Sequence, residues 1–412
     1  MIKRRDIWKW SAPLTVAALT ATVITSAQAT ETGSAGGGAP VIGSPAKVDF
    51  ADPVEFKAGK RSWSVAYADF DGDGKIDAAT ANGGNSLSVF KGNGDGTFTA
   101  RTDYATPKMP YFLTFDLTTA DFNGDGKPDI AVSGGNPIGN VGIYLNKGDG
   151  TFADPLPVPV GYGPNQVAAA DLNHDGKADL ITANNFAANV SVRLGHGNGT
   201  FGPERRFSVG PGPQGIAIAD VNGDHVPDIL TGNFGRIEDS LTVLIGRGDG
   251  TFADQRSYAA GESVNDVAVA DFNRDGIPDV VVGEFVNNRI SVLLGRRHGG
   301  FGPPQTYATG TGLNELTVAD FNNDGVPDVV TTVSPDSNRD PSAPPPSDPK
   351  GAGVSVLLGK GNGTFAPNTF YSMAGTVAAV KAADVNNDGK TDLLGANLAD
   401  ESLVVWVNKG TQ

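Results

Sequence analysis

The nine residues Asp69-Phe70-Asp71-Gly72-Asp73-Gly74-Lys75-Ile76-Asp77 form a stretch that occurs, with small changes, seven times in the chain of 412 residues. Side chains with oxygen atoms occupy positions 1, 3, 5 and 9, and glycine occupies position 6. Oxygens at alternate positions of a tight loop converge on one point, where carboxylates repel one another unless a cation lies between them. Because hard oxygen ligands in this number suit Ca2+, the stretch predicts a calcium loop. It closes between two extended runs, which favours a β-hairpin.

The other six copies have Asp at positions 1, 5 and 9 and Asn at position 3. A turn without an ion could explain one copy, but turn propensity alone does not readily explain seven. His225 replaces the glycine at position 6, where a positive φ would be strained, so the loop 220–228 is expected to be the weakest site. The candidate side-chain ligands are Asp69, Asp71, Asp73, Asp77, Asp121, Asn123, Asp125, Asp129, Asp171, Asn173, Asp175, Asp179, Asp220, Asn222, Asp224, Asp228, Asp271, Asn273, Asp275, Asp279, Asp320, Asn322, Asp324, Asp328, Asp384, Asn386, Asp388 and Asp392.

Composition restricts the class of partner. The formal charge is −15, and the loops supply 22 of the 46 acidic residues, so the acidity reflects ligand chemistry. No basic face for nucleic acid is evident. The absence of cysteine excludes disulfides and leaves metal ions as the available cross-links.

Residues 1–29 are predicted to be a signal peptide. Basic residues at 3–5 and 9 precede a modest apolar run, and Ala27-Gln28-Ala29 is a small-x-small cleavage site. The run is too short and too rich in threonine to span a membrane. The pair Arg4-Arg5 is also typical of twin-arginine export, and both export routes stay open. The protein is therefore expected in the periplasm or outside the cell, with residues 30–45 as a flexible linker.

The period of the loops predicts the architecture. Their first residues are 49 to 52 residues apart, with one spacing of 64. Each unit has four short extended runs, and small and branched residues alternate in the run before the loop, as in Gly215-Ile216-Ala217-Ile218-Ala219. Such residues suit a crowded innermost strand, so the pattern predicts propeller blades or a solenoid.

The register of phenylalanine favours a closed ring. Phe50 precedes Asp69 by 19 residues, the same spacing at which five later Phe residues precede the next loop. The chain thus starts at a fourth strand and ends before one. We predict an all-β fold: a seven-bladed β-propeller of four-stranded antiparallel blades over residues 46–412, closed by an N-terminal strand at 50–57 that completes the C-terminal blade. The Pro-rich insert 332–352, between the second and third strands of one blade, is either a disordered loop or a recognition loop.

These repeats resemble the FG-GAP/VCBS family, whose calcium-binding blades also occur in the integrin α-chain head and in some fungal lectins. The resemblance covers about nine-tenths of the chain and implies a seven-bladed propeller stabilised by up to seven Ca2+ ions. It also implies that the carbonyl at position 7 is a ligand. That position holds Lys75, Lys127, Lys177, Val226, Ile277, Val326 and Lys390. Members include adhesion heads, lectins and propellers attached to enzymes, so the resemblance does not settle a ligand.

The face opposite the calcium loops is expected to bind the partner, because its loops vary most. Its candidate contact residues are Trp63, Tyr111, Tyr162, Phe186, Phe234 and Phe285. Aromatic side chains beside amides suit sugar or peptide contacts. The alternative is that Phe186, Phe234 and Phe285 plug the gaps between blades, since they recur in register.

The leading interpretation is an exported, monomeric, non-catalytic binding scaffold for an extracellular protein or glycan. The four histidines fall in turns of different repeats, and no Ser-His-Asp order is evident, which disfavours an enzyme. A lectin-like propeller and, less favoured, a polysaccharide-active enzyme are the alternatives.

Overall fold

The computed structural model describes residues 47–107, 114–134, 139–235, 240–335 and 351–411. The predicted signal peptide, the linker and Tyr111 lie outside these ranges, as does most of the insert. Residues 332 and 333 continue one strand and residue 352 begins the next, so these ends of the predicted insert belong to the blade.

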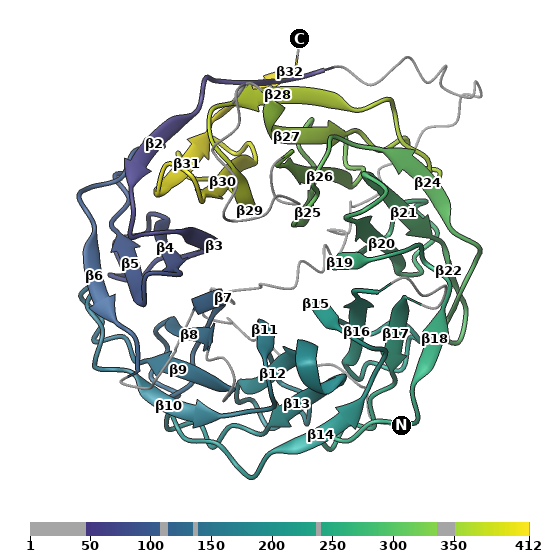
Figure 1. The fold of residues 1–412 in the computed structure, drawn as a ribbon, viewed down its shortest axis with the longest axis horizontal. Coiled ribbons are helices and arrows are strands. Elements are labelled where there is room, and N and C mark those ends of the chain that lie inside the picture. The colour runs from purple at the N-terminus through teal and green to yellow at the C-terminus, as the bar shows by residue number, and fades with distance from the viewer. Residues whose placement is uncertain (1–46, 108–113, 135–138, 236–239, 336–350, 412) are drawn as a thin grey trace, which may run out of the picture.

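Seven four-stranded antiparallel sheets surround a central opening (Figure 1). This confirms the predicted seven-bladed all-β propeller. From the inside outward, the first two blades consist of β3 (Ser62–Ala68), β4 (Asp77–Asn82), β5 (Ser86–Phe90) and β6 (Thr102–Ala105), and of β7 (Thr114–Ala120), β8 (Asp129–Gly134), β9 (Asn140–Tyr144) and β10 (Leu156–Pro159). The third, fourth and fifth consist of β11 (Pro164–Ala170), β12 (Asp179–Asn184), β13 (Asn189–Arg193) and β14 (Arg205–Ser208); of β15 (Pro213–Ala219), β16 (Asp228–Asn233), β17 (Leu241–Leu244) and β18 (Arg256–Tyr258); and of β19 (Val264–Ala270), β20 (Asp279–Glu284), β21 (Arg289–Leu293) and β24 (Gln305–Ala308). The sixth and seventh consist of β25 (Leu316–Ala319), β26 (Asp328–Val333), β27 (Ala352–Leu357) and β28 (Thr369–Met373), and of β29 (Val377–Ala383), β30 (Asp392–Asn397), β31 (Ser402–Trp406) and β2 (Val54–Lys57). A small hairpin, β22 (Gly295–Arg296) and β23 (Gly300–Phe301), and the 3-10 turn η1 (Asn185–Ala187) complete these elements.

The last blade takes its outermost strand from the N-terminal side of the chain. Strand β2 pairs antiparallel with β31, with Val54 opposite Val405. A second pair joins β1 (Val48–Phe50) to β32 (Asn408–Thr411). The sequence predicted one strand over 50–57, but the structure has two short ones, separated by a segment that contains Pro53, which lacks a backbone N–H.

The phenylalanine register marks a contact between neighbouring blades. The Phe that follows each Gly-rich turn packs against position 2 of the loop in the preceding blade. Edge-to-face ring pairs result, such as Phe70–Phe152, with centroids 5.3 Å apart, and Phe272–Phe365, at 5.4 Å. Phe50 makes the same contact with Phe321, at 6.2 Å. Each such pair contributes about 0.5–1.5 kcal/mol beyond its buried area.

The hydrophobic core lies between blades and not inside one sheet. Every residue of each second strand is buried, as in β4 and β20. One cluster joins Leu87 and Val89 of the first blade to Ile130 and Val132 of the second. Because both faces of a blade are covered by its neighbours, the second strands are buried on both sides.

Candidate metal loops, channel and ligand face

Each nine-residue loop joins the first and second strands of its blade. Position 9 begins the second strand and is buried in every blade. In the first blade, Asp77 accepts hydrogen bonds from the backbone N–H of Phe70 (2.9 Å) and of Gly92 (2.7 Å). The same two bonds recur in all seven blades. The closing Asp therefore fastens the loop to the segment that follows the third strand, a structural role that the sequence analysis missed.

Position 1 organises the loop from the other end. Asp69 accepts N–H bonds from Gly72 and Gly74, both at 2.8 Å, and its counterparts accept the bond from position 6 in every blade. The backbone N–H of position 7 donates to the carboxylate at position 5 in all seven loops. Each of these carboxylate oxygens has further lone pairs that can face a cation.

Left-handed backbone is needed at two positions of each loop. The φ of His225 at position 6 is 66°, as the sequence predicted for that position. However, position 4 is also left-handed, and four other loops place a non-glycine residue there: His174, Arg274, Asn323 and Asn387, with φ from 58° to 60°. Strain is therefore shared among loops, which weakens the reason for singling out 220–228 as the weakest site.

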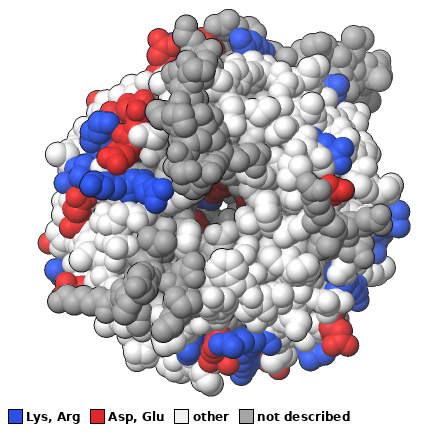
Figure 2. All heavy atoms as spheres, in the orientation of Figure 1, with Lys and Arg blue, Asp and Glu red and all other residues white. Residues whose placement is uncertain are grey.

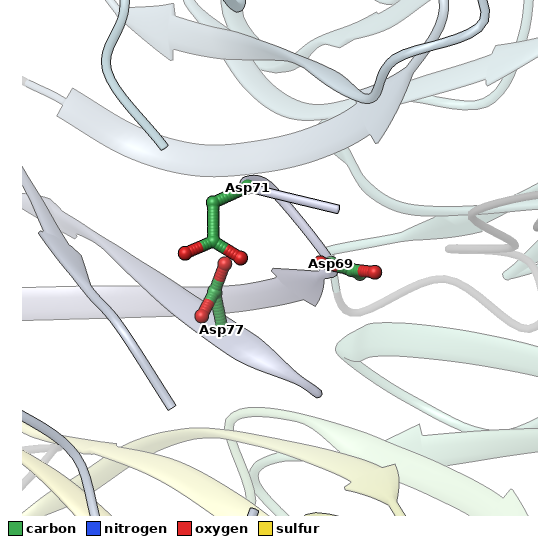
Figure 3. Close-up of side chains that lie close together, drawn as sticks. All are labelled: Asp69, Asp71 and Asp77. Atoms are coloured by element: carbon green, nitrogen blue, oxygen red, sulfur yellow. The ribbon is translucent and has the colours of Figure 1, made fainter. Parts of the chain in front are cut away.

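The first loop brings three carboxylates together. Oxygens of Asp69, Asp71 and Asp77 lie within 4.8 Å of one another (Figure 3), and no other group of three acidic, histidine or cysteine residues does so within the described residues. The other loops have Asn at position 3. These all-oxygen sets fit a hard divalent cation. In the first loop, the ammonium of Lys91 contacts Asp71 and Asp73, so positive charge is favoured there.

Burial raises the pKa of every closing Asp. The pKa is about 6 for Asp77 and for five counterparts and about 7 for Asp328, against an ordinary value of 3.8. The two backbone N–H bonds oppose this effect, and the acids at neighbouring loop positions add to it. A bound cation would stabilise the ionised form instead.

The predicted contact residues on the opposite face fall into two kinds. Tyr162 and Phe186 are 47% and 59% exposed, and their ring centroids lie 5.4 Å apart. Phe285 is buried and packs against Phe234 at 5.8 Å. The plug interpretation thus fits Phe234 and Phe285, whereas Phe186 is available to a partner. Trp63 is 36% exposed.

Trp63 belongs to a ring of side chains at the mouth of the central channel. The residue six positions before each loop lines a cavity of about 140 Å³. Six of the innermost strands have a register shift there, and such a bulge re-aims side chains. The ring consists of Trp63, Phe115, Asn165, Gln214, Asn265, Asn314 and Ala378.

A charged layer lies one residue further into the channel. Asp116, Asp266 and Glu315 each accept a backbone N–H bond from the next blade, from Val167 (3.0 Å), Leu316 (2.9 Å) and Val380 (3.2 Å), respectively. Lys381 of β29 donates to Glu315. Acidic atoms are visible in the central hollow of the molecule (Figure 2). The sequence analysis missed this layer, although its three acidic residues each stand five positions before a loop.

The comparisons with known proteins agree with this architecture. The FG-GAP-like repeat model matches residues 69–132, 121–182, 175–231, 234–282, 271–331 and 347–395. No curated protein matches the chain. In the described ranges, no helix is long and apolar enough to cross a membrane.

Two solved structures of BBS1N in complex with ARL6DN, soaked with mercury and with lead, share the fold. Both are 12% identical, with TM-scores of 0.58 and 0.57; they cover 89% and 88% of this chain and 100% and 97% of their own. A lectin of Agrocybe aegerita that recognises non-reducing terminal N-acetylglucosamine is 22% identical, with a TM-score of 0.48 and 85% coverage of each chain. With repeat matches that span most of its length, the chain belongs to the FG-GAP-like repeat family.

Proposed function

We propose that this protein is an exported, non-catalytic binding scaffold, stabilised by Ca2+ in the first hairpin of each blade, whose partner docks on the face opposite the calcium loops. The observation that carries the proposal is the aromatic pair Tyr162–Phe186. Both rings are about half exposed, and they pack against each other. Exposed aromatic side chains held on a rigid ring supply contact area at low entropic cost.

The partner is an extracellular protein or a glycan. The BBS1N propeller was crystallised with ARL6DN, so this fold is compatible with a protein partner. The aromatic pair, on the other hand, suits the apolar face of a sugar ring, which makes a lectin the second candidate. A polysaccharide-active enzyme is the less favoured third candidate, because the three carboxylates that line the channel cavity accept backbone N–H bonds that join neighbouring blades.

A glycan array on the mature protein separates these candidates. A lectin should give a defined set of bound glycans, which Phe186→Ala should lose. Phe370→Ala is the matched control, because Phe370 is also an exposed aromatic residue (44%) but lies on the outermost strand β28. An array without binding leaves the protein-binding scaffold. Turnover of a polysaccharide by the purified protein would contradict both versions.

A further inference from the structure

The channel mouth carries more negative than positive charge. Its deeper layer holds Asp116, Asp266 and Glu315, all at least 91% buried, against the single ammonium of Lys381. Lys381 is hydrogen-bonded to Glu315. Asp116 accepts instead from the Ser64 hydroxyl (2.7 Å). Carboxylates removed from water are costly unless a positive charge compensates them, so the layer favours a further cation.

Burial also raises the pKa of Asp116 and of Asp266, because it disfavours the charged form. For Lys381, burial alone would lower the pKa, but the three carboxylates outweigh it and raise the pKa of the ammonium. The raised pKa values of the two acids and of the ammonium both show that the site favours positive charge or a bound proton.

The ring above this layer presents hydrogen-bond acceptors. Asn265 Nδ2 donates to the Leu313 carbonyl (3.3 Å), while Asn265 Oδ1 is buried without a donor among the described residues. This unpaired acceptor belongs to a residue that lines the cavity. Asn165, Gln214 and Asn314 add amide oxygens around the same cavity, and Trp63 adds an exposed ring that can cover a cation.

The spacing of the acids favours an organic cation over a metal ion. Within the described ranges, only Asp69, Asp71 and Asp77 bring three carboxylates within 4.8 Å, so the three channel acids do not converge on one ion as those of the first loop do. The cavity of about 140 Å³ is several times the roughly 30 Å³ share of one water molecule in the liquid. An organic cation is larger than a metal ion and carries several N–H donors. It therefore fits both the volume of the cavity and the distance between its acceptors.

We propose that the channel mouth binds an organic cation through a primary ammonium or guanidinium group, which donates to the ring of amides, lies against Trp63 and neutralises the carboxylates of Asp116 and Asp266. The cation is either a free solute or a Lys or Arg side chain of a partner. This site uses neither the calcium loops nor the pair Tyr162–Phe186, so its failure would leave the proposed binding function intact.

Isothermal titration of the mature protein in calcium buffer tests the site. The probes are ethylguanidinium and 1,4-diaminobutane, with ethylurea as the neutral counterpart of the first. The cations should bind at least about tenfold more tightly than ethylurea, and their affinity should fall as salt rises. A blocked Gly-Arg-Gly peptide distinguishes the sources: tighter binding of the peptide identifies a presented side chain, and tighter binding of the diamine identifies a free solute.

Two variants locate the binding. Asp266→Asn removes one charge and should weaken cation binding about tenfold, whereas Asp254→Asn, an exposed acid outside the channel, should not. Since Asp266 also accepts the Leu316 N–H, its variant needs a melting control. Gln214→Leu removes one amide of the ring, leaves the bond between Asp266 and the Leu316 N–H in place, and should also weaken cation binding. Any of three results would overturn the proposal. Ethylurea binds as tightly as the cations, neither cation binds up to about 10 mM, or both channel variants keep the affinity of the wild type.

Discussion

The ammonium of Lys91 lies against the carboxylate of Asp71, and 3.3 Å from that of Asp73, in the one blade that has Asp rather than Asn at position 3. In the other six blades, the residue directly after the third strand is apolar. These residues are Leu145, Leu194, Ile245, Leu294, Leu358 and Val407. The additional negative charge of the first loop is thus matched by an additional positive charge.

Replacing Lys91 by Met should therefore tighten Ca2+ binding at the first loop, by roughly threefold to tenfold, because the ammonium that competes for Asp71 is gone. In the wild-type protein, the first loop should not be the tightest site, contrary to a count of carboxylates alone. Titration calorimetry on the two proteins checks this, with Lys60→Met, an exposed lysine away from the loops, as the control. Equal affinities for wild type and Lys91→Met would refute the compensation.

Removal of calcium should destabilise the whole ring. If Ca2+ binds the folded loops and not the open chain, as we propose, each site adds roughly 2.7 kcal/mol to the free energy of unfolding at a hundredfold excess over Kd. We expect EDTA to lower Tm by many degrees and excess Ca2+ to restore it. Scanning calorimetry with elemental analysis of the chelated sample provides the measurement. A Tm that EDTA leaves unchanged in a sample shown to be free of metal would mean that the loops bind no structural calcium.

The stabilisation by calcium should grow with pH. In the metal-free protein, burial raises the pKa of the closing Asp residues to about 6, and to about 7 for Asp328, from an ordinary value of 3.8. The folded state thus holds these protons more tightly than the unfolded chain. Their contribution to stability is full below about pH 4 and is lost as pH rises through 6 to 7. Calcium needs the ionised carboxylates, so its contribution runs in the opposite direction.

Melts at pH 5 and pH 8, each with EDTA and with Ca2+, measure this difference. The difference in Tm between the Ca2+ sample and the EDTA sample should be larger at pH 8 than at pH 5. The Tm of the EDTA sample itself should be lower at pH 8 than at pH 5. A gap that is equal at both pH values would show that the closing carboxylates do not titrate in the metal-free protein.

The sequence predicted the blades because the loop and the phenylalanine recur at a fixed register, and local repetition is visible without coordinates. The roles of Asp77 and Asp266 could not be predicted in the same way. Asp77 bonds a backbone N–H that lies 15 residues away, and Asp266 bonds one that lies 50 residues away in the next blade. Such partners depend on how strands pair and on where each innermost strand bulges. Phe285 directly follows its second strand and is buried, whereas Phe186 comes one residue later in its own blade and is exposed. The repeat alone does not show that a shift of one position has this effect.

The seam between the two ends of the chain should be needed for a stable ring. Deleting residues 46–57 removes β1 and β2 and leaves the apolar strand β31 with an unpaired edge. We expect this truncation to melt earlier and to aggregate on size-exclusion chromatography. Deleting residues 30–45, the predicted linker, should change neither property and is the control. If the protein without 46–57 stays monomeric and keeps its Tm, pairing across the seam does not support the fold.

A point substitution tests the same seam without changing chain length. Phe50 is 7% exposed and packs edge-to-face on Phe321 and on Tyr371, the latter at 5.2 Å, so it joins the N-terminal segment to the blade of β25–β28. Phe50→Ala should cost about 3–5 kcal/mol of unfolding free energy, through lost burial and the cavity left behind. Phe370→Ala, on the exposed side of β28, should cost far less. Equal denaturation midpoints for the two variants in urea would show that Phe50 contributes no more than a surface ring, and that the ring of blades is held closed by the backbone pairing of β2 with β31 alone.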